Sequence, residues 1–455
     1  MISLWKYHKI PFLFFIVSCI VYLWFAYDIT RVETTQLLLL YIVLFVFAFQ
    51  IIQKTGFNFK LLVIFSIVFR LLFLFAIPNL SQDFYRFIWD GRMIIEGYNP
   101  YLFTPDSFIQ NGKFPIPQAQ ELYNGMGTLS ASHFTNYPPI NQLCFTIAAI
   151  FSGQNILGSV VVMRVLIIAA DIGTLFFGKK LLERLKLPSN RIFWYILNPF
   201  IIIELTGNLH FEGVMIFFLM WSLYLLHSGK WKWAAVVLAC SISVKLIPLM
   251  LLPLFFGWFT TKKLNDITET LGLLKLITFY TMVMATTLFL FLPFFSIDFV
   301  TNYSKTVGLW FGNFEFNASM YYLARAIGYA ITGYNEIAII GKILPIIAVL
   351  IILGFSFFKQ NNSLAKLATS MLLALTCYLF LSTTVHPWYI ATLVILSIFT
   401  NYKFPLVWSL VIIISYLAYS NTDNSENLWI IALEYSIVFS VFIWELCFKK
   451  KLPVT

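Results

Sequence analysis

The chain has 455 residues, of which 60% are hydrophobic, 19% aromatic and only 11% charged, and its mean hydropathy is +0.84. Soluble domains carry roughly a quarter charged residues, so this composition excludes a cytosolic enzyme, a secreted domain and a disordered scaffold. The apolar composition predicts an all-α polytopic integral membrane protein. In such a protein a formal net charge of +10 is explained by basic residues in the cytoplasmic loops, so we expect no binding of nucleic acid.

The apolar residues form fourteen runs that are long enough, or nearly long enough, to cross a bilayer as helices. These runs lie at about residues 10–27, 36–53, 61–77, 155–178, 192–207, 211–227, 232–244, 246–260, 273–295, 337–357, 366–383, 387–401, 404–419 and 428–447. Several are short for a span of roughly 20 residues, so we expect about 12–14 transmembrane helices. The first run is followed by Asp28-Ile29-Thr30-Arg31 and not by a small-residue cleavage site, so it is predicted to be a retained helix.

The distribution of basic residues predicts the topology. With the N-terminus in the cytoplasm, the cytoplasmic side receives 20 of the 30 lysines and arginines, including those at 179–191 and 449–451, and both termini. The run 140–152 is not counted as a crossing, because it would turn 179–191 outward, and is expected at the outer interface. Two external segments, 78–137 and 296–336, are long enough to carry binding or chemistry.

The first external segment begins with acidic and basic residues at helical spacing. Asp83, Arg86 and Asp90 lie at i, i+3 and i+7, on one face of a helix. A carboxylate beside a cation stays ionised at neutral pH and can accept a proton from a hydroxyl group. Asp83 is therefore a candidate catalytic base, and the alternative is an exposed ladder of ion pairs. At the end of the segment, Asn136 and Tyr137 either face a polar substrate or have a structural role.

Three charged residues lie within the membrane runs that follow or precede this segment. Arg164 and Asp171 are seven residues apart in one run, share a helix face and are expected to pair, whereas Arg70 has no evident partner. Further on, an external hairpin brings together Glu204, His210 and Glu212. A metal site there is possible, but residues two apart on a helix do not face each other and no further ligand is evident, so no metal is expected.

Lys245 is the most informative single residue of the second half of the chain. An unpaired lysine within the bilayer costs roughly 2.5–3.5 kcal/mol, so it is a functional candidate by default, and a membrane-level ammonium suits a lipid phosphate. The alternative is a side chain that reaches the interface. His386, followed by Pro387, Trp388 and Tyr389, begins a later run at the outer side and could hold a sugar against aromatic faces.

Taken together, these motifs resemble the GT-C superfamily of multi-span glycosyltransferases that use polyprenyl-phosphate sugars, and within it the mannosyltransferase-like branch. The resemblance covers most of residues 60–400. The residues that carry it are Gln82-Asp83-Phe84-Tyr85-Arg86, Trp89-Asp90-Gly91-Arg92, Gly97-Tyr98-Asn99-Pro100-Tyr101, Tyr137-Pro138-Pro139-Ile140, Val244-Lys245-Leu246-Ile247-Pro248, Asn317-Ala318-Ser319 and His386-Pro387-Trp388-Tyr389.

The resemblance implies an inverting transfer in which Asp83 is the general base. The family often has two adjacent acids at this place, whereas Asp83 is flanked by Gln82 and Phe84. Asp90 could therefore be the partner acid, or the base itself. Lys245 is then the first choice for binding the donor phosphate, assisted by Arg86 or Arg92. The residues implied to line the sugar or acceptor pocket are Tyr137, Asn136, His210, Glu212 and His386. No metal or other cofactor is implied.

The sequence therefore predicts a GT-C-like fold in three parts, with a pair of helices at 1–60, a catalytic module at 61–336 and further helices at 337–455. The expected function is transfer of a hexose, with mannose implied by the resemblance, from a polyprenyl-phosphate donor to a lipid, glycan or protein hydroxyl. The expected location is the plasma (inner) membrane, among membrane lipids, with the active site on the external or periplasmic face. The alternative is a transporter or flippase. A transporter predicts weak symmetry between the two halves of the chain, and the sequence shows no internal repeat.

Overall fold

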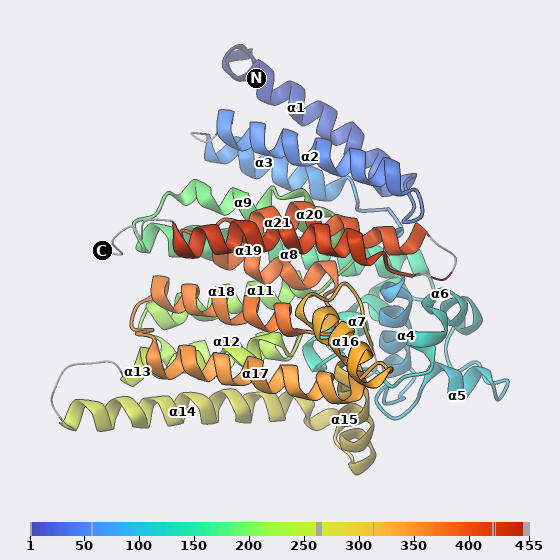
Figure 1. The fold of residues 1–455 in the computed structure, drawn as a ribbon. Helices are drawn as coiled ribbons and strands as arrows, with labels where there is room; N and C mark the ends of the chain where they lie inside the picture. The colour runs from blue at the N-terminus through green and yellow to red at the C-terminus, as the bar shows by residue number, and fades with distance from the viewer. Residues whose placement is uncertain are drawn as a thin grey trace. The chain divides into compact units, whose positions relative to one another are not determined.

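A computed structural model describes residues 2–55, 58–260, 266–312, 314–420, 423 and 425–448 (Figure 1). The regular structure of these residues is helical, and the one exception is an isolated β-bridge between Phe316 and Thr384. The expected all-α class is therefore confirmed. The basic residues 449–451, used in the topology prediction, lie outside the described residues.

The helices of the first half of the chain are α1 (Ile2–Tyr27), α2 (Thr34–Thr55), α3 (Phe59–Leu71), α4 (Asp83–Ile95), α5 (Pro105–Ile109), α6 (Ala119–Ala131), α7 (Pro139–Ser152), α8 (Ile156–Arg184), η1 (Ser189–Ile192), α9 (Phe193–Ile196), α10 (Pro199–Ile201), η2 (Ile202–Gly207) and α11 (Glu212–His227). Those of the second half are α12 (Trp231–Ile242), η3 (Ile247–Phe255), α13 (Phe256–Thr260), α14 (Asp266–Phe291), η4 (Leu292–Phe294), α15 (Ile297–Gly312), α16 (Met320–Thr332), α17 (Ile337–Phe358), α18 (Leu364–Leu381), η5 (Pro387–Ile390), α19 (Ala391–Ser397), α20 (Phe404–Val411), η6 (Ile412–Ser420) and α21 (Leu428–Cys447).

Seven of the described helices are long and apolar enough to cross a membrane, and an eighth span results if the pair Pro199–Gly207 and Glu212–His227, bent by 113°, is counted as one. The protein is thus a polytopic integral membrane protein, as expected. All fourteen predicted runs contain helix, but several are shorter than a span. Prolines contribute to this: η3 starts beside Pro248 and contains Pro253, and η5 starts at Pro387, because proline removes a backbone donor.

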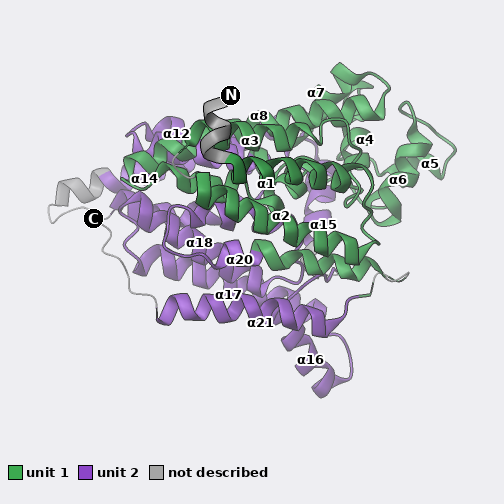
Figure 2. Ribbon diagram, turned by 90° about the horizontal axis from the view of Figure 1, so that it is seen from above, with its two compact units in different colours: residues 1–135, 141–214, 409–425 green, residues 136–140, 215–408, 426–455 purple. Residues whose placement is uncertain are grey.

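The chain divides into two compact units, coloured separately in Figure 2. Unit 1 comprises residues 1–135, 141–214 and 409–425, and unit 2 comprises 136–140, 215–408 and 426–455. In unit 1, α1, α2 and α3 pack side by side. In unit 2, α12 packs against α14 and α17 packs against α18. The three sequence segments proposed above are a different division, and their domain boundaries stay a prediction.

The expected pair between Arg164 and Asp171 in unit 1 is wrong. Asp171 Oδ2 accepts instead from Nε of Arg70, at 2.7 Å, and both side chains are buried. The buried Arg164 guanidinium donates to backbone carbonyls beyond α3 and at the end of η2, namely those of Leu74, Ala76, Thr206 and Gly207. Carbonyls at helix ends have no hydrogen-bond partner within their helix, and a bilayer offers no water to replace it. The buried guanidinium therefore supplies the missing hydrogen bonds at both places.

Close packing of α4 on α7 in unit 1 depends on Gly91. A Cβ atom added at Gly91 would overlap the backbone carbonyl oxygen of Phe145, which cannot move without displacing α7. We expect Gly91→Ala to lower the free energy of unfolding by about 1–3 kcal/mol, as overpacking does. Gly354→Ala, in α17 with open space around the new methyl group, is the matched control and should be neutral or slightly stabilising. Thermal midpoints of the purified variants in detergent check this, and equal midpoints would contradict it.

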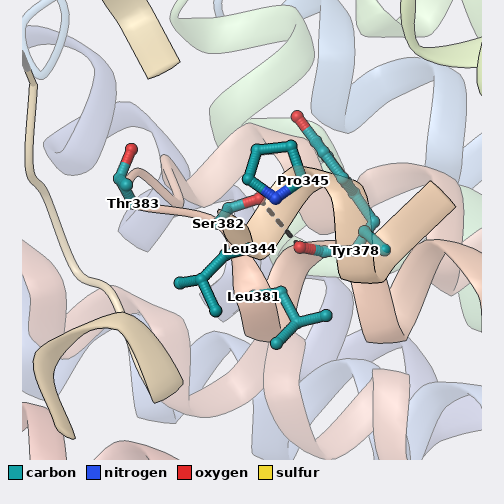
Figure 3. A pocket seen from close by; sticks show the side chains of 7 residues that line it. Leu344, Pro345, Tyr378, Leu381, Ser382 and Thr383 are labelled. Carbon is teal, nitrogen blue, oxygen red and sulfur yellow. Dashed lines mark hydrogen bonds between the residues drawn. The ribbon is translucent and has the colours of Figure 1, made fainter. Parts of the chain in front are cut away.

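A small pocket in unit 2 lies between α17 and the end of α18 (Figure 3). Leu344, Pro345 and Ala348 line it from α17, and Tyr378 and residues 381–383 line it from the other side. The Ser382 hydroxyl at its edge donates to the carbonyl of Tyr378 at 2.8 Å. With room for roughly one water molecule, this pocket is too small for a sugar, and it contains none of the candidate site residues.

Candidate active site

Asp83 is the first residue of α4, in unit 1. Its side chain is half-buried, and its backbone N–H donates to the Ser81 hydroxyl at 3.3 Å. A negative charge in the first turn of a helix is favoured by the helix dipole. The sequence therefore places a carboxylate at a helix N-terminus where it is partly open to its surroundings, as a general base must be.

Asp90, two turns further along α4, is fully buried. Its Oδ1 accepts from Arg86 Nε at 2.8 Å, and its Oδ2 accepts from Gln142 Nε2 at 3.0 Å. Both carboxylate oxygens are therefore engaged inside the protein, and Arg86 is also buried. The pair is not the exposed ladder considered as an alternative. A base must be reached by the hydroxyl that it deprotonates. Asp90 is completely buried and Asp83 is half-buried, and a catalytic role for either stays a prediction.

The two arginines of α4 are bonded to backbone carbonyls of segment 78–137. Arg86 Nη1 donates to the carbonyls of Ser130 and His133, at 2.6 and 2.9 Å. Arg92 Nη1 donates to the carbonyl of Pro117 at 2.7 Å. These contacts tie α4 to both ends of the α6 region. A phosphate-binding role for Arg86 and Arg92 stays a prediction, but both guanidiniums are engaged in holding this segment.

The break between η2 and α11 brings together Glu204 and His210 in unit 1. His210 Nε2 lies 3.8 Å from Glu204 Oε2, and Glu204 also accepts from the Asn208 amide and from the hydroxyl of Tyr416, at 3.3 and 2.9 Å. Glu212 begins α11. All these side chains are almost completely buried, so they lie within the protein and not on an open surface. A pocket-lining role for His210 and Glu212 stays a prediction.

A second group of candidate residues lies in unit 2, where α12 ends. Lys245 occupies the irregular stretch between α12 and η3, is half-buried, and its Nζ lies 5.2 Å from the ring centroid of Tyr137. Such a cation over an aromatic face is held electrostatically. Two hydrogen bonds fix the segment that carries Tyr137: the Ile140 N–H donates to the Ser243 carbonyl at 2.8 Å, and the Tyr303 hydroxyl donates to the Asn136 carbonyl at 3.3 Å.

His386 completes this second group and is surrounded by aromatic rings. Its imidazole stacks on Trp388, with centroids 4.6 Å apart and planes 5° apart, and on Phe316 at 5.1 Å and 28°. Burial, together with the positive charge of Lys245, lowers the pKa of His386 to about 3. The imidazole is therefore neutral at neutral pH, so Lys245 is a cation of this group and His386 is not. A neutral ring among aromatic faces suits contact with a sugar.

The depressed pKa of His386 predicts acid sensitivity. Between pH 6.5 and about 3 the unfolded chain binds a proton at this residue and the folded chain does not, so stability is lost as the pH falls through that range. We expect the thermal midpoint of the wild type to fall more steeply below pH 6.5 than that of His386→Gln. His133→Gln, in unit 1, serves as the control and should behave as the wild type. Parallel pH profiles for wild type and His386→Gln would contradict this.

No group of three or more histidine, cysteine, aspartate or glutamate side chains with metal-binding geometry occurs among the described residues. Glu204 and His210 lie near each other, but two ligands do not make a metal site.

Comparison with known proteins decides the family. Residues 16–262, more than half of the chain, match the family described as "Alpha-(1->6)-mannopyranosyltransferase, N-terminal domain". The chain belongs to this family. The resemblance to mannosyltransferases of the GT-C type is therefore confirmed at the level of the family. Asp83, Arg86, Asp90 and Lys245 lie within the matched residues, whereas His386 lies outside them.

Two curated relatives, both named Alpha-(1->6)-mannopyranosyltransferase A, are similar to this chain. One, from Corynebacterium glutamicum, is 24% identical over 202 residues, which are 42% of this chain and 39% of the relative. The other, from Mycobacterium tuberculosis, is 20% identical over 194 residues, which are 42% of this chain and 36% of the relative. The match thus spans less than two fifths of either relative. No solved structure is significantly similar to the chain.

Several residues of these groups were not found by sequence reasoning. Gln142 binds Asp90, Tyr416 binds Glu204, and Phe316 stacks on His386, each across at least 52 residues of chain. The only local signal was that Phe316 and Tyr416 each lie within three residues of another aromatic residue, in a chain that is 19% aromatic. Nothing in that background distinguishes them.

Proposed function

We propose that this protein is an inverting mannosyltransferase that moves mannose from a polyprenyl-phosphate donor to the hydroxyl group of an acceptor. The observation that carries the proposal is the position of Asp83, a half-buried carboxylate at the N-terminus of α4, within the part of the chain that matches the mannosyltransferase family. The acceptor is a glycan, lipid or protein hydroxyl, of which a glycan agrees with the family description.

In the proposed reaction the acceptor oxygen attacks the anomeric carbon of mannose. Asp83 takes the proton of the acceptor hydroxyl as the new carbon–oxygen bond forms. The bond between the anomeric carbon and the phosphate oxygen breaks, and its electron pair leaves with the polyprenyl phosphate. A single displacement of this kind inverts the anomeric configuration. General-base assistance is typically worth about 10²–10⁴ in rate.

Lys245 is proposed to stabilise the phosphate that leaves. A lipid phosphate is already acidic, so its departure requires a nearby positive charge more than a proton. Lys245 supplies an ammonium group, and Tyr137 lies under that group and limits where it points. Arg86 and Arg92 are proposed to assist Lys245. Both guanidiniums also hold backbone carbonyls of segment 78–137, so Lys245 remains the first choice.

The sugar or acceptor is proposed to contact the aromatic group of unit 2. His386 presents a neutral imidazole stacked on Trp388 and Phe316, and Tyr137 and Asn136 precede the stiff pair Pro138 and Pro139. His210 and Glu212 are more deeply buried. Their proposed role is to maintain the break between η2 and α11 more than to touch the sugar.

The location of this chemistry is also part of the proposal. With both termini in the cytoplasm of a plasma (inner) membrane, the segments 78–137 and 296–336 lie on the external or periplasmic side, as the distribution of basic residues favours. The catalytic part would be residues 61–336. The hydrophobic donor then reaches the site from the membrane.

The proposal is tested by supplying the purified full-length chain in detergent with labelled mannose on two donors, polyprenyl phosphate and GDP. A native membrane-lipid extract provides acceptors. We expect label to pass from the polyprenyl-phosphate donor alone into a new product. Transfer from the nucleotide sugar, or no transfer while the lipid donor remains unbound, would contradict the proposal.

A further inference from the structure

Asn317 lies in the loop between α15 and α16, in unit 2, and takes a backbone conformation that few residues adopt. Its φ is +46°, in the left-handed region, where asparagine is among the few non-glycine residues found regularly. The residue is completely buried. It belongs to the motif Asn317-Ala318-Ser319, to which the proposed reaction assigns no role, and it lies outside the residues that match the family.

Three groups from α21 and the residues before it hold Asn317. Its backbone N–H donates to Glu426 Oε1 at 2.6 Å, its carbonyl accepts from the Tyr435 hydroxyl at 2.7 Å, and its amide Nδ2 donates to Glu434 Oε1 at 3.3 Å. Backbone and side chain are thus bonded at the same time. Because both backbone groups are bonded, the partners of Asn317 hold its backbone at a positive φ that asparagine tolerates.

The residue before Asn317 carries this constraint to the aromatic group. The Phe316 N–H donates to the Thr383 carbonyl at 3.1 Å, and the Val385 N–H donates to the Phe316 carbonyl at 2.8 Å, which forms the β-bridge to Thr384. The Thr384 hydroxyl also donates to the Phe314 carbonyl at 3.0 Å. His386 follows Val385 directly, and its imidazole stacks on Phe316. The backbone of Asn317 therefore adjoins the bridge that places Phe316 on His386.

We propose that Asn317 is a positioning residue for the sugar-binding surface formed by Phe316, His386 and Trp388, and that α21 sets this position through Glu434 and Tyr435. The inference rests on the proposed function for its substrate, a mannosyl group. Asn317 itself does not touch the sugar. Its role is to keep Phe316 in the register of the β-bridge, so that the imidazole of His386 remains stacked on the Phe316 ring.

Two substitutions separate the contributions of backbone and amide. Asn317→Gly keeps access to a positive φ and both backbone hydrogen bonds, and loses only the bond to Glu434. Asn317→Ala loses that bond and also strains the backbone. If Asn317 positions the sugar-binding surface, the KM for polyprenyl-phosphate mannose should rise roughly 3-fold in Asn317→Gly and about 10-fold in Asn317→Ala, with a smaller change in kcat.

The matched control is Asn361→Ala. Asn361 is also completely buried in unit 2, where its amide donates to the carbonyls of Leu254 and Phe355 and accepts from the Ser370 hydroxyl. None of these three hydrogen bonds involves a residue of the β-bridge. We expect Asn361→Ala to lower the thermal midpoint as much as Asn317→Ala does, while the donor KM of the folded protein stays at the wild-type value.

A readout without catalysis keeps this inference separate from the proposed function. Diethyl pyrocarbonate modifies accessible neutral imidazoles, and mass spectrometry gives the extent of modification at His386. We expect faster modification of His386 in Asn317→Ala than in wild type or Asn361→Ala. If the wild type neither binds the lipid donor nor transfers mannose, the proposed function fails and the modification rate alone decides the inference. The positioning role would be overturned if His386 in Asn317→Ala is modified at the wild-type rate and, wherever transfer is measurable, the donor KM of this variant equals that of the wild type.

Discussion

Asp83→Asn is expected to reduce the rate of mannosyl transfer by about 10²–10⁴, the usual value of general-base assistance. The amide that replaces the carboxylate has nearly the same shape, but it cannot take a proton from the acceptor. Because the donor phosphate is assigned to Lys245, binding of polyprenyl-phosphate mannose should persist. The side chain of Asp83 is half-buried and begins α4, so the protein should still fold. Initial rates and donor binding, both measured on purified protein, check these expectations.

Two further acids of segment 78–137 make this prediction specific. Asp106 is also half-buried and accepts a hydrogen bond from the Tyr123 hydroxyl at 2.6 Å, so Asp106→Asn should leave the transfer rate near that of the wild type. Asp90→Asn removes the charge that pairs with the buried Arg86 and should cost about 3–5 kcal/mol of stability, as breaking a buried ion pair does. Full activity in Asp83→Asn, or an equal rate loss in Asp106→Asn, would exclude Asp83 as the base.

Lys245→Met is expected to lower kcat about 10²–10³-fold, the range found when one stabilising group is removed from a developing negative charge. Methionine keeps the length and the apolar stem of the side chain but carries no charge. The loss should appear in kcat more than in the affinity for acceptor, because the phosphate gains negative charge as the bond to mannose breaks. Lys245→Arg keeps the positive charge and should recover part of the rate.

Lys305→Met is the matched control for the lysine substitution. Lys305 lies on α15 in the same unit and is exposed, so its replacement should leave kcat unchanged. A donor carrying a better leaving group, such as a polyprenyl phosphate with an electron-withdrawing substituent, should lose less rate in Lys245→Met than the natural donor. Equal kcat values for wild type and Lys245→Met would remove Lys245 from the mechanism.

Local features of the site could be predicted from sequence, and long-range ones could not. The pair of Arg86 and Asp90 follows from a spacing of four residues on a helix. The same reasoning paired Arg164 with Asp171, and there it was wrong. Asp171 has a partner 101 residues away in Arg70, and Arg164 satisfies backbone carbonyls that become available only when two helices end beside it. Periodicity gives no information about where separate helices meet.

The class of the protein was predictable because composition and apolar run length depend on the bilayer and not on the contacts between helices. The apolar runs are found as helices, but their division into spans depends on breaks such as that between η2 and α11, where a π-helical turn and a bend of 113° bury Glu204 and His210. No spacing rule identifies such a break. Likewise, the stack of His386 on Phe316 requires a β-bridge between residues that the sequence separates widely.

The central claim is a single displacement in which an acceptor oxygen replaces a lipid phosphate at the anomeric carbon of mannose. The measurement that tests it most directly is the anomeric configuration of the product made by the wild-type protein from polyprenyl-phosphate mannose labelled with ¹³C at the anomeric carbon. We expect one product, with the configuration opposite to that of the donor. A product with the configuration of the donor would contradict the single displacement and the assignment of Asp83 as its general base.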